Sequence, residues 1–466
     1  MLVGEVTSIP HLEQTRIDGI LEVQVNGVST DSRTVARGNI FVALRGERFN
    51  GHEFVDQAFL GGALLAVVDQ KGVADVHSQI PLLIVADTTG ALGDLATRYR
   101  ARFDIPVIGI AGSNGKTTTK DMVAAVLSRK LNVLKTEGNL NNNIGVPMTL
   151  FQLDASHEVA VIEIGTNHPG ELAVLCNIAA PTMGLISSIG REHLEFFNTL
   201  DGVEIEETAL FHYLANRPGS TVFVNVDEPR IARHVPAAMR AIRYGIGAEA
   251  EIRGTIASHN EEDGAVLSFD DVRTRQHGEL SLHIAGDHNA LNALAAIAVG
   301  YSFEVPQPQI VEALEAFQPS SKRLEREVIL GVTILNDTYN ANPDSMLASL
   351  RVLASAHTKG KRIAVLGDMK ELGESGPSEH ARIGSAINSM GIEYVLGYGD
   401  LAAFLIQAVQ GPFAVHYTQK NLMAEYLAEL VSEGDVVLVK GSRSMKLEDV
   451  VIFVEERLRA TATKAS

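Results

Sequence analysis

The sequence predicts an α/β protein built from three domains. Its 466 residues correspond to about three domains of the usual size, roughly 150 residues each. Short apolar runs alternate with amphipathic segments of helical length along most of the chain, and Pro106 and a polar stretch at 318–323 interrupt this alternation. We therefore expect a small N-terminal α/β domain at 1–104, a central domain with a mainly parallel sheet at 105–318, and a C-terminal Rossmann-like domain at 319–466.

Strand-like apolar runs separated by turns predict the N-terminal domain. These runs lie at 20–25, 39–44, 63–68 and 82–87. Two helices are expected among and after them, at 52–62 and 88–103. Pro106 then breaks the helical pattern just before a new apolar strand, which gives the first boundary.

The central domain is predicted from strands that are apolar throughout and end in polar turns. They lie at 107–111, 159–165, 184–190 and 221–227. This pattern is typical of a parallel sheet with crossover helices. Between 250 and 285 the strand-like segments have no helical material between them, so we expect an antiparallel extension there. Two helices, at about 287–302 and 308–317, end the domain.

The last third has the most regular alternation. Its expected strands lie at 333–337, 362–368, 394–399, 414–418 and 436–441. A helix-length amphipathic segment separates each strand from the next, which predicts a doubly wound, Rossmann-like domain.

Composition limits the classes of function. The chain is 45% hydrophobic and 21% charged, which is ordinary for a globular protein, and its formal net charge is −18. The negative electrostatic field of such a chain disfavours binding of nucleic acid and of anionic lipid. An anionic substrate can bind only where local cations or backbone N–H groups reverse that field. The first residues lack the positive charge of a signal peptide, and no apolar run approaches the ~18 residues of a membrane span, so we expect a cytoplasmic protein without an integral membrane segment.

A phosphate-binding motif begins the central domain. The strand at 107–111 runs into GSNGKTTT at 112–119 and then into a helix. Glycines let backbone N–H groups approach phosphates, Lys116 reaches the outer phosphates, and Thr117 offers its hydroxyl to Mg²⁺. Only the shorter core GxxGKT is present, because Ile110 stands where the strict pattern has glycine. With the flanking strand and helix, the motif predicts a phosphate-loop ATPase domain.

Several other polar residues have either a functional or a purely structural interpretation. Glu163 ends an otherwise apolar strand, so it either holds Mg²⁺, directly or through water, or is an ordinary solvated strand end. His193 lies just after the next strand, where it could be a metal ligand, a base or a loop residue. Asparagines at 138–147 and 286–296 form either a rim for a polar ligand or a turn and a helix cap. Cys176 is the only cysteine, and its apolar surroundings predict a buried side chain.

The sequence resembles the Mur ligases, ATP-dependent enzymes that form amide bonds in peptidoglycan synthesis. Motifs occur in this family's order along essentially the whole chain: GSNGKTTT (112–119), NNNIGVP (141–147), EIGTNHPGEL (163–172), IGREHLEFF (189–197), DHNALNALAA (287–296), DTYNANPDSM (337–346), LGDMKELGE (366–374) and VKGSRSMKLEDVV (439–451). DTYNANPDSM, LGDMKELGE and KGSR are most similar to the family member that joins D-alanyl-D-alanine to UDP-N-acetylmuramoyl-tripeptide.

The resemblance implies ATP and Mg²⁺ and assigns residues to them. The expected nucleotide contacts are Gly112, Ser113, Asn114, Gly115, Lys116, Thr117, Thr118, Asn289, Arg323 and Asp337. Thr117 and Glu163 are expected to hold one Mg²⁺, and His193 to help hold a second. Lys116, Glu163 and His193 are therefore the expected catalytic residues.

The resemblance also implies two substrates, UDP-N-acetylmuramoyl-tripeptide and D-alanyl-D-alanine. Residues expected at the UDP-sugar are Ser29, Thr30, Asp31, Ser32, Arg33, Asn50, Gly51 and His52. Those expected at the peptide rim are Asn139, Asn142, Thr166 and Asn167. Those expected on the D-alanyl-D-alanine side are Asn340, Asn342, Lys440, Ser442 and Arg443. Lysine and diaminopimelate are both compatible with the third peptide position, and we expect the protein to be a monomer.

The implied reaction activates a peptide carboxylate with ATP. Its oxygen attacks the γ-phosphate to give an acyl phosphate, the amine of D-alanyl-D-alanine attacks the acyl carbon, and ADP and phosphate are released. Such a reaction needs positioning and positive charge rather than a protein nucleophile. The sequence has no convincing Ser/His/Asp or reactive cysteine arrangement.

One position departs from the family pattern. Many relatives carry a carbamoylated lysine that helps arrange the second metal, but the aligned position here is Ile205. We hypothesise that Glu204, Glu206 or Glu207 supplies the missing carboxylate directly. The alternative is that His193, substrate and water hold the second metal alone.

Two other functions compete with the ligase reaction above. One is another amide ligase of the same superfamily, such as a different Mur ligase or a folate polyglutamate synthase. The other is a nucleotide-binding regulator without ligase activity, which only Ile205 favours.

Overall fold

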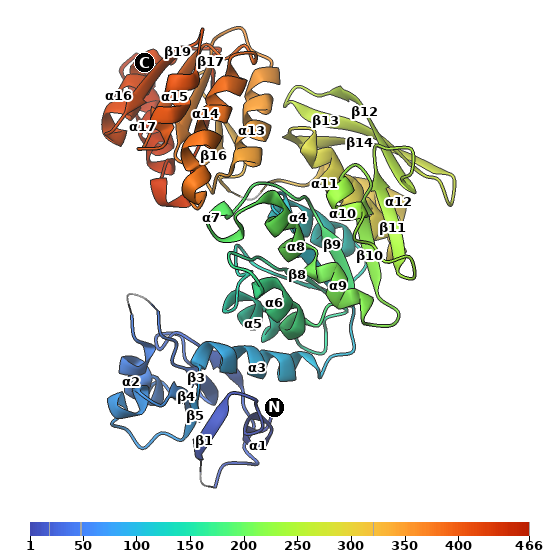
Figure 1. The fold of residues 1–466 in the computed structure, drawn as a ribbon, viewed down its shortest axis with the longest axis vertical. Coiled ribbons are helices and arrows are strands. Elements are labelled where there is room, and N and C mark those ends of the chain that lie inside the picture. The colour runs from blue at the N-terminus through green and yellow to red at the C-terminus, as the bar shows by residue number, and fades with distance from the viewer. Residues whose placement is uncertain (18, 47–48, 320, 466) are drawn as a thin grey trace.

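The three-domain α/β fold predicted from the sequence is confirmed by the structure, a computed structural model that describes residues 1–17, 19–46, 49–319 and 321–465. Figure 1 shows the N-terminal, central and C-terminal parts following one another along the longest axis. The strands form three sheets, with residues 12–85, 107–285 and 325–440 respectively. Ser320, within the expected linker, lies outside the described residues, and the boundaries near 104 and 318 stay predictions.

The N-terminal sheet has the order β1-β5-β4-β3-β2. Its strands are β1 (Leu12–Arg16), β2 (Gly27–Ser29), β3 (Asn39–Val42), β4 (Leu65–Asp69) and β5 (Leu82–Val85), all parallel except β1. The helices are α1 (Val3–Val6), α2 (Val55–Leu60) and α3 (Thr88–Arg100), with the 3₁₀ turns η1 (Gly51–Phe54) and η2 (Gly72–Asp75). Asp87 caps α3 by accepting the Thr89 and Gly90 N–H groups.

The strand predicted at 20–25 is wrong. Its backbone bonds irregularly to the N-terminal segment instead, since Val3 N–H donates to Val23 O and Val25 N–H donates to Met1 O. Leu21 and Val23 are exposed, so this segment lacks the buried face that a strand of this sheet needs.

The central sheet has the order β14-β13-β12-β11-β10-β9-β6-β8-β7. Its strands are β6 (Val107–Ala111), β7 (Val133–Lys135), β8 (Val159–Glu163), β9 (Met183–Ile186), β10 (Thr221–Asn225), β11 (Arg240–Gly245), β12 (Ile252–His259), β13 (Gly264–Asp271) and β14 (Gln276–Ala285). Neighbours from β7 to β12 pair in parallel, whereas β12, β13 and β14 pair antiparallel, so the predicted extension at 250–285 is present.

Helices cover both faces of the parallel part of this sheet. One face packs against α4 (Lys116–Leu127), α11 (His288–Ser302) and α12 (Gln307–Glu315). The other carries α5 (Gly145–Leu150), α6 (Glu171–Ala179), α8 (Leu200–Glu207) and α9 (Ala209–Ala215), with the short α7 (Leu194–Phe197) and α10 (Pro229–Ala232) nearby. Cys176 on α6 is buried in this second core, as predicted.

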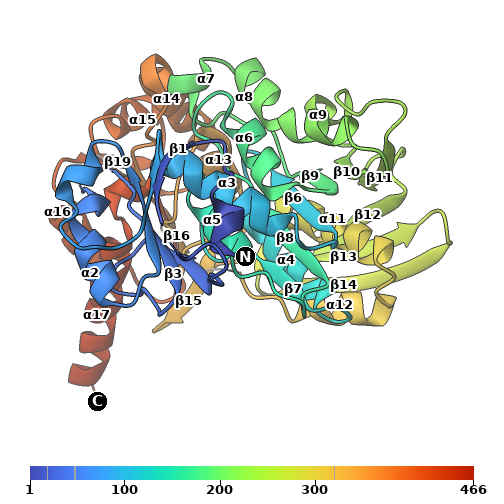
Figure 2. The same ribbon diagram turned by 90° about the horizontal axis from the view of Figure 1, so that it is seen from below.

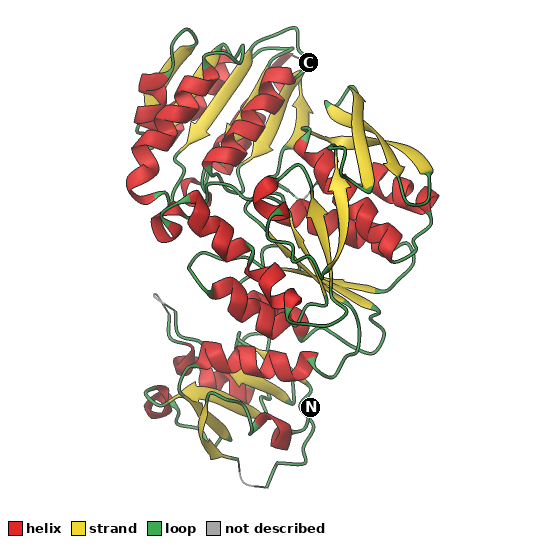
Figure 3. Cartoon of the chain, turned by 45° about the vertical axis from the view of Figure 1, so that its right-hand side comes forward, coloured by secondary structure: helices red, strands yellow, loops and turns green. Residues whose placement is uncertain are grey.

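The C-terminal sheet has the order β15-β16-β20-β17-β18-β19. Its strands are β15 (Glu325–Ile329), β16 (Val332–Asp337), β17 (Arg362–Gly367), β18 (Tyr394–Tyr398), β19 (Phe413–Tyr417) and β20 (Val436–Lys440). The five predicted strands are present and parallel, and β15, which was not predicted, adds an antiparallel edge. Figure 3 shows the three groups of strands with helices packed around them.

Helices pack on both faces of the C-terminal sheet, as in a doubly wound domain. They are α13 (Pro343–Ser355), α14 (Gly376–Ile387), α15 (Ala402–Ala408), α16 (Lys420–Leu430) and α17 (Glu448–Ala465), with turns η3 (Gly373–Ser375) and η4 (Arg443–Met445). Figure 2 gives the view from below, with α17 extending toward the C-terminus. No helix in the described ranges is long and apolar enough to cross a membrane.

The central and C-terminal domains share packing. One hydrophobic cluster contains Phe197 of α7 and Leu372 beside η3. Figure 1 places α7 between the two domains. The side chains between the two domains are therefore held in place by the packed sheets of both domains.

Candidate active site

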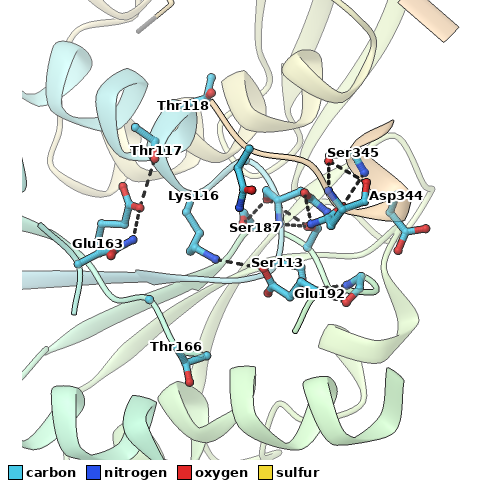
Figure 4. A pocket seen from close by; sticks show the side chains of 18 of the residues that line it. Ser113, Lys116, Thr117, Thr118, Glu163, Thr166, Ser187, Glu192, Asp344 and Ser345 are labelled. Carbon is cyan, nitrogen blue, oxygen red and sulfur yellow. Dashed lines mark hydrogen bonds and ion pairs between the residues drawn. The ribbon is translucent and has the colours of Figure 1, made fainter. Parts of the chain in front are cut away.

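A cavity of about 1020 Å³ lies between the central and C-terminal domains. Its walls come from the phosphate loop, the asparagine segment after β7, the ends of β8 and β9, and the segment that follows β16. Figure 4 shows Lys116, Thr117 and Glu163 close together on one side of the view and Asp344 and Ser345 on the other. The carboxyl ends of parallel strands meet here, which is where α/β sheets bind ligands.

Backbone geometry explains the two glycines of the phosphate loop. Gly112 has φ +118° and Gly115 has φ +83°, both in the region that disfavours side chains. A Cβ on Gly112 would lie 2.5 Å from Ser187 Oγ and 2.8 Å from its backbone nitrogen. The loop can therefore lie close to the end of β9 only with glycine, and α4 then starts at Lys116 with its N–H groups facing the cavity wall.

Lys116 is a buried cation among carboxylates. Its Nζ donates to Gly112 O and lies 3.8 Å from Glu192 Oε2. Burial lowers the pKa of Lys116, but Glu192, Glu207 and Glu163 together outweigh burial and raise it above its ordinary value. Lys116 therefore stays protonated, as a phosphate-binding lysine must.

Glu163 lies beside the first turn of α4. Its Oε1 accepts from Thr117 Oγ1 at 3.2 Å and from Asn141 Nδ2 at 2.8 Å. Its Oε2 is buried, accepts no hydrogen bond from the residues that the structure describes, and lies 3.9 Å from Lys120 Nζ. Hard oxygen ligands with a free lone pair suit Mg²⁺, so Thr117 and Glu163 fit the metal that the sequence predicts.

His193 links the two domains. Its Nδ1 lies 2.5 Å from Glu371 Oε2 in the C-terminal domain, and its Nε2 lies 3.8 Å from Glu192 Oε2. The close approach of the His193 ring lowers the pKa of Glu371. His193 sits at φ +48°, so the backbone is held in an unusual conformation to aim this ring.

Arg323 is stacked on an aromatic ring in the cavity wall. Its guanidinium lies 3.9 Å from the centroid of the Tyr339 ring, and both residues line the cavity. Stacking fixes the plane of the guanidinium and leaves its edge donors available. Arg323 is close enough to Lys116 that its charge opposes the rise in the lysine pKa.

Asp337 and Lys440 form a buried ion pair in the C-terminal wall. Lys440 Nζ lies 2.6 Å from Asp337 Oδ2 and also donates to Asn340 O at 3.0 Å. Asp337 accepts in addition from Ser349 Oγ at 2.6 Å and from Leu324 N–H at 3.2 Å. Asp337 was predicted at the nucleotide and Lys440 at the dipeptide, and the structure places the two in contact with each other.

Asn289 belongs to a chain of buried amides. Its Nδ2 donates to Ala285 O, and its Oδ1 accepts from Asn292, which in turn accepts from Thr119 Oγ1 on α4. The network ties α11 to the helix of the phosphate loop. Asn289 lines the cavity near its predicted nucleotide.

The remaining predicted residues divide into two groups. Those that line the cavity are Ser113, Asn114, Gly115, Thr118, Asn139, Asn142, Thr166, Asn167, Asn340, Asn342 and Arg443. Those that do not line it are Gly112, Ser442 and the eight residues of the N-terminal domain. Gly112 turns the backbone behind Lys116, and Ser442 Oγ accepts from Lys370 N–H at 2.8 Å.

Direct contacts join the phosphate loop to the C-terminal domain. Asn342 caps α13 through Ser345 N–H, and its Nδ2 donates to Asn114 Oδ1 at 2.9 Å. Arg191 pairs with Asp344 at 3.1 Å and with Glu379 at 3.6 Å. Hydrogen bonds and ion pairs therefore hold the two walls of the cavity against each other.

Comparison with known proteins identifies the family. The Mur ligase family catalytic domain matches residues 24–100, the Mur ligase middle domain matches 110–300, and the Mur ligase glutamate ligase domain matches 322–443. A UDP-N-acetylmuramoyl-tripeptide--D-alanyl-D-alanine ligase of Bacillus subtilis is 35% identical over 447 residues, which covers 95% of this chain and 94% of the relative. The chain belongs to the Mur ligase family.

Solved structures of Mur ligases have the same fold. MurF of Acinetobacter baumannii is 29% identical with a TM-score of 0.89, and the match covers 98% of both chains. MurF of Thermotoga maritima, solved in complex with ADP, is 27% identical with a TM-score of 0.82, and the match covers 93% of this chain and 98% of that one. The recognition made from the motifs is confirmed.

In this Mur ligase the predicted UDP-sugar residues gather at one edge of the N-terminal sheet. Ser29 ends β2, and Asn50 to His52 follow β3, so both motifs lie at the carboxyl ends of parallel strands. Asp31 and Arg33 form an exposed pair at 2.6 Å. The side chain of His52 is fully buried; it bonds to Asn50 Oδ1 at 2.8 Å and accepts from Asp69 N–H, so it positions Asn50 rather than facing solvent.

Prediction from sequence missed several residues of the Mur ligase site. They are Tyr339 under Arg323, Glu371 on His193 and the buried Glu192 beside Lys116. Asn141, which bonds to Glu163, and Glu207 were each named from the sequence only as one of several candidates. Glu192 directly precedes His193 in the motif IGREHLEFF, so the motif itself was a signal for it.

Ile205, the position that the family resemblance pairs with a carbamoylated lysine, does not face the site. Ile205 is 70% exposed, whereas Glu207 on the same helix is fully buried and accepts from Gly112 N–H at 2.5 Å; neither residue lines the cavity. An α-helix turns by about 100° per residue, so a difference of two positions moves a side chain to the opposite face. A side chain at 205 could not deliver a carboxylate to the phosphate loop.

Proposed function

We propose that this Mur ligase joins D-alanyl-D-alanine to UDP-N-acetylmuramoyl-tripeptide, with ATP converted to ADP and phosphate. The product is the pentapeptide precursor of peptidoglycan. The observation that carries the proposal is that the phosphate loop and the motif DTYNANPDSM, which the sequence assigns to the dipeptide side, face each other across one cavity. The near full-length similarity to ligases of that name supports the same substrates.

The reaction proceeds in two steps, formation of an acyl phosphate and formation of the amide bond. A carboxylate oxygen of the tripeptide attacks the γ-phosphorus of ATP, the bond to the β-γ bridging oxygen breaks, and ADP leaves. The amine of D-alanyl-D-alanine then attacks the acyl carbon, phosphate leaves with the electron pair of the C–O bond, and the nitrogen loses a proton. Inorganic phosphate is therefore formed once for each amide bond.

The residues of the central wall supply positive charge and orientation for the first step. Lys116 is held as a cation and would contact the outer phosphates, where charge develops in the transition state. Thr117 and Glu163 would hold Mg²⁺, which neutralises phosphate charge when bound. Arg323 would contact the nucleotide from the C-terminal side with its stacked guanidinium.

The residues of the other walls would hold the two substrates. Asn139, Asn142, Thr166 and Asn167 lie on the side of the asparagine segment, where the peptide is expected. Asn340, Asn342, Lys440 and Arg443 lie across from them, where we place D-alanyl-D-alanine. The edge of the N-terminal sheet with Ser29 to Arg33 would hold the UDP-sugar. We place the protein in the cytoplasm and expect it to be a monomer.

Phosphate release tests the proposal. Purified protein with Mg²⁺ and ATP should release phosphate rapidly only when UDP-N-acetylmuramoyl-tripeptide and D-alanyl-D-alanine are both present, and mass spectrometry should show the pentapeptide product. Release without D-alanyl-D-alanine, or with glutamate replacing it equally well, would instead favour a regulator or another amide ligase.

A further inference from the structure

The helix of the phosphate loop contains a second buried lysine, one turn after Lys116. Lys120 on α4 is 1% exposed, and lysine is almost never buried to this extent unless it is paired. Lys120 does not line the cavity, so it lies behind the wall and not at a ligand. Its ammonium group must therefore serve other residues of the protein.

Three oxygens surround the ammonium group of Lys120. Its Nζ donates to Thr136 O at 2.7 Å and lies 3.2 Å from Asp121 Oδ1 and 3.9 Å from Glu163 Oε2. Glu163 lines the cavity and is itself only 1% exposed. Lys120 thus connects the buried interior of the central domain with the carboxylate that fits Mg²⁺.

One face of α4 holds both oxygens of this carboxylate. Thr117 and Lys120 are three positions apart, so their side chains are neighbours on the helix surface. Thr117 Oγ1 donates to Glu163 Oε1 at 3.2 Å, as Figure 4 shows, whereas Lys120 lies beside Oε2, which accepts no hydrogen bond from the described residues. Among those residues, Lys120 makes the only ion pair of Glu163.

Thr136 connects Lys120 to the backbone of Glu163 as well. Thr136 is fully buried; its carbonyl accepts from Lys120, and its Oγ1 accepts from the N–H of Glu163 at 3.0 Å. Lys120 therefore acts on Glu163 through the end of β8 and also directly through its charge.

The other carboxylate near Lys120 has a cation of its own. Asp121 lies 2.8 Å from Nζ of Lys135, a side chain that is 35% exposed. A buried carboxylate without a counter-charge is costly, and removal of one partner from a buried pair is strongly destabilising. Glu163, and not Asp121, is therefore the carboxylate that depends on Lys120.

We propose that Lys120 is a positioning residue for Mg²⁺, because its ammonium is the resident counter-ion of Glu163. It compensates the buried negative charge before the metal binds from the cavity side. Once the metal is bound, two cations share one carboxylate, so Lys120 weakens metal binding and keeps the metal exchangeable. The proposal rests on the Mg²⁺ site of the proposed function and on no property of the acceptor substrate.

Manganese binding tests this role without turnover. Mn²⁺ replaces Mg²⁺, and its binding is measured by electron paramagnetic resonance with a non-hydrolysable ATP analogue; Glu163→Gln identifies the Mn²⁺ that depends on Glu163 by weakening it. Lys120→Met should bind this Mn²⁺ about tenfold more tightly, since a like charge a few ångströms away is removed. Thr117 and Asn141 still hold Oε1 in this variant. Unchanged or weaker binding, as expected for a merely structural lysine, would overturn the proposal.

Lys135→Met is the matched control. Lys135 pairs with the same Asp121, but in the described part of the chain it makes no ion pair with Glu163. This variant should bind Mn²⁺ with wild-type affinity. Equal tightening in Lys135→Met and Lys120→Met would overturn the proposal, because it would reflect net charge alone.

Thermal stability without metal or nucleotide tests the pair itself. Lys120→Met should melt at a lower temperature than the wild type, and Lys120→Met/Glu163→Gln should recover part of this loss, since neither charge is then buried alone. If Lys120→Met does not fold, the double variant decides: recovered folding supports the pair, and a double variant no more stable than Lys120→Met overturns it.

Failure of the metal site would be distinguishable from failure of the role of Lys120. If Glu163→Gln keeps every Mn²⁺ at wild-type affinity, the Mg²⁺ site of the proposed function is wrong, and the role of Lys120 with it. If Glu163→Gln weakens one Mn²⁺ while Lys120→Met leaves it unchanged, only the role of Lys120 is wrong.

Discussion

The two walls of the cavity satisfy their buried charges in different ways. On the central wall, Glu163 and Glu192 each have one buried oxygen that accepts from no N–H or hydroxyl group of the described residues. On the C-terminal wall, Asp337 accepts from three side-chain and backbone donors, among them Lys440. The central wall therefore keeps unsatisfied acceptors, whereas the buried charge on the C-terminal wall is paired.

Removal of the Asp337 charge should cause the largest loss of stability. In Asp337→Asn the ammonium of Lys440, which is 3% exposed, loses its counter-ion, and breaking such a buried pair costs about 3–5 kcal/mol. Urea unfolding of the variant and the wild type would measure this loss. Asp400→Asn, at an exposed position in the same domain, is the control and should leave the free energy of unfolding unchanged. A loss under about 1 kcal/mol in Asp337→Asn, within the usual range for a surface pair, would show that the two walls do not differ in this way.

Substitution of Lys116 should give the largest loss of activity. Lys116→Met removes the buried cation that we place at the transferring phosphoryl group, so kcat for phosphate release should fall about 10²–10³-fold. Lys130→Met, beyond the end of α4, should turn over normally because Lys130 contacts only the Phe303 and Glu304 carbonyls and the Glu304 carboxylate. Near-normal turnover of Lys116→Met would remove this residue from the catalytic step.

Glu192→Gln should stabilise the protein without ligand, in contrast to Asp337→Asn. Burial raises the pKa of Glu192 well above 4.5, so the folded state holds this proton more tightly than the unfolded chain. Stability from this group is present at low pH and is lost as the pH rises from the unfolded pKa through the folded one. The variant should therefore gain about 1–3 kcal/mol near neutral pH, the usual cost of an unsatisfied buried polar group. Melting temperatures over a pH series would measure it, and equal slopes for variant and wild type would contradict the prediction.

The stacked pair Arg323–Tyr339 should give the smallest effect. Tyr339→Ala removes the ring beneath the guanidinium, and a cation–π contact of about 0.5–2 kcal/mol corresponds to a two- to thirtyfold rise in the KM for ATP. Tyr339→Phe keeps the ring and should restore the wild-type KM. If the phenylalanine variant behaves like the alanine variant, the hydroxyl rather than the stacking matters.

Sequence reasoning predicted the fold from elements with strong periodicity. The phosphate loop, the strands of the central sheet other than β7 and β11, and the parallel strands of the C-terminal sheet were found, because each has a pattern that local physics enforces. The segment at 20–25 failed because an apolar run does not by itself supply a neighbouring strand. β15 was missed because Glu325–Ile329 begins with three charged residues and buries only Ile329, so it has no apolar run.

Most of the site residues that belong to sequence motifs were predicted. Those on a helix that buries its charged residues were harder to predict. On α8, Ile205 is exposed while Glu204, Glu206 and Glu207 are buried, the reverse of the usual amphipathic pattern. The family resemblance pointed to position 205, which is exposed, whereas the three glutamates offered as alternatives are buried. Contacts between domains, such as Glu371 with His193, depend on residues nearly 180 positions apart in sequence, a separation that no local pattern spans.

The single cysteine has a practical consequence. Cys176 is buried within the core beneath α6, and burial raises the pKa of its thiol, so it should not react with maleimide dyes under native conditions. The unmodified chain should therefore take up no thiol-reactive dye. Two cysteines introduced on exposed surfaces, one in the N-terminal domain and one in the C-terminal domain, would be the only sites to take up a fluorophore pair. Energy transfer between them would then report the opening and closing of the ligase as each substrate arrives.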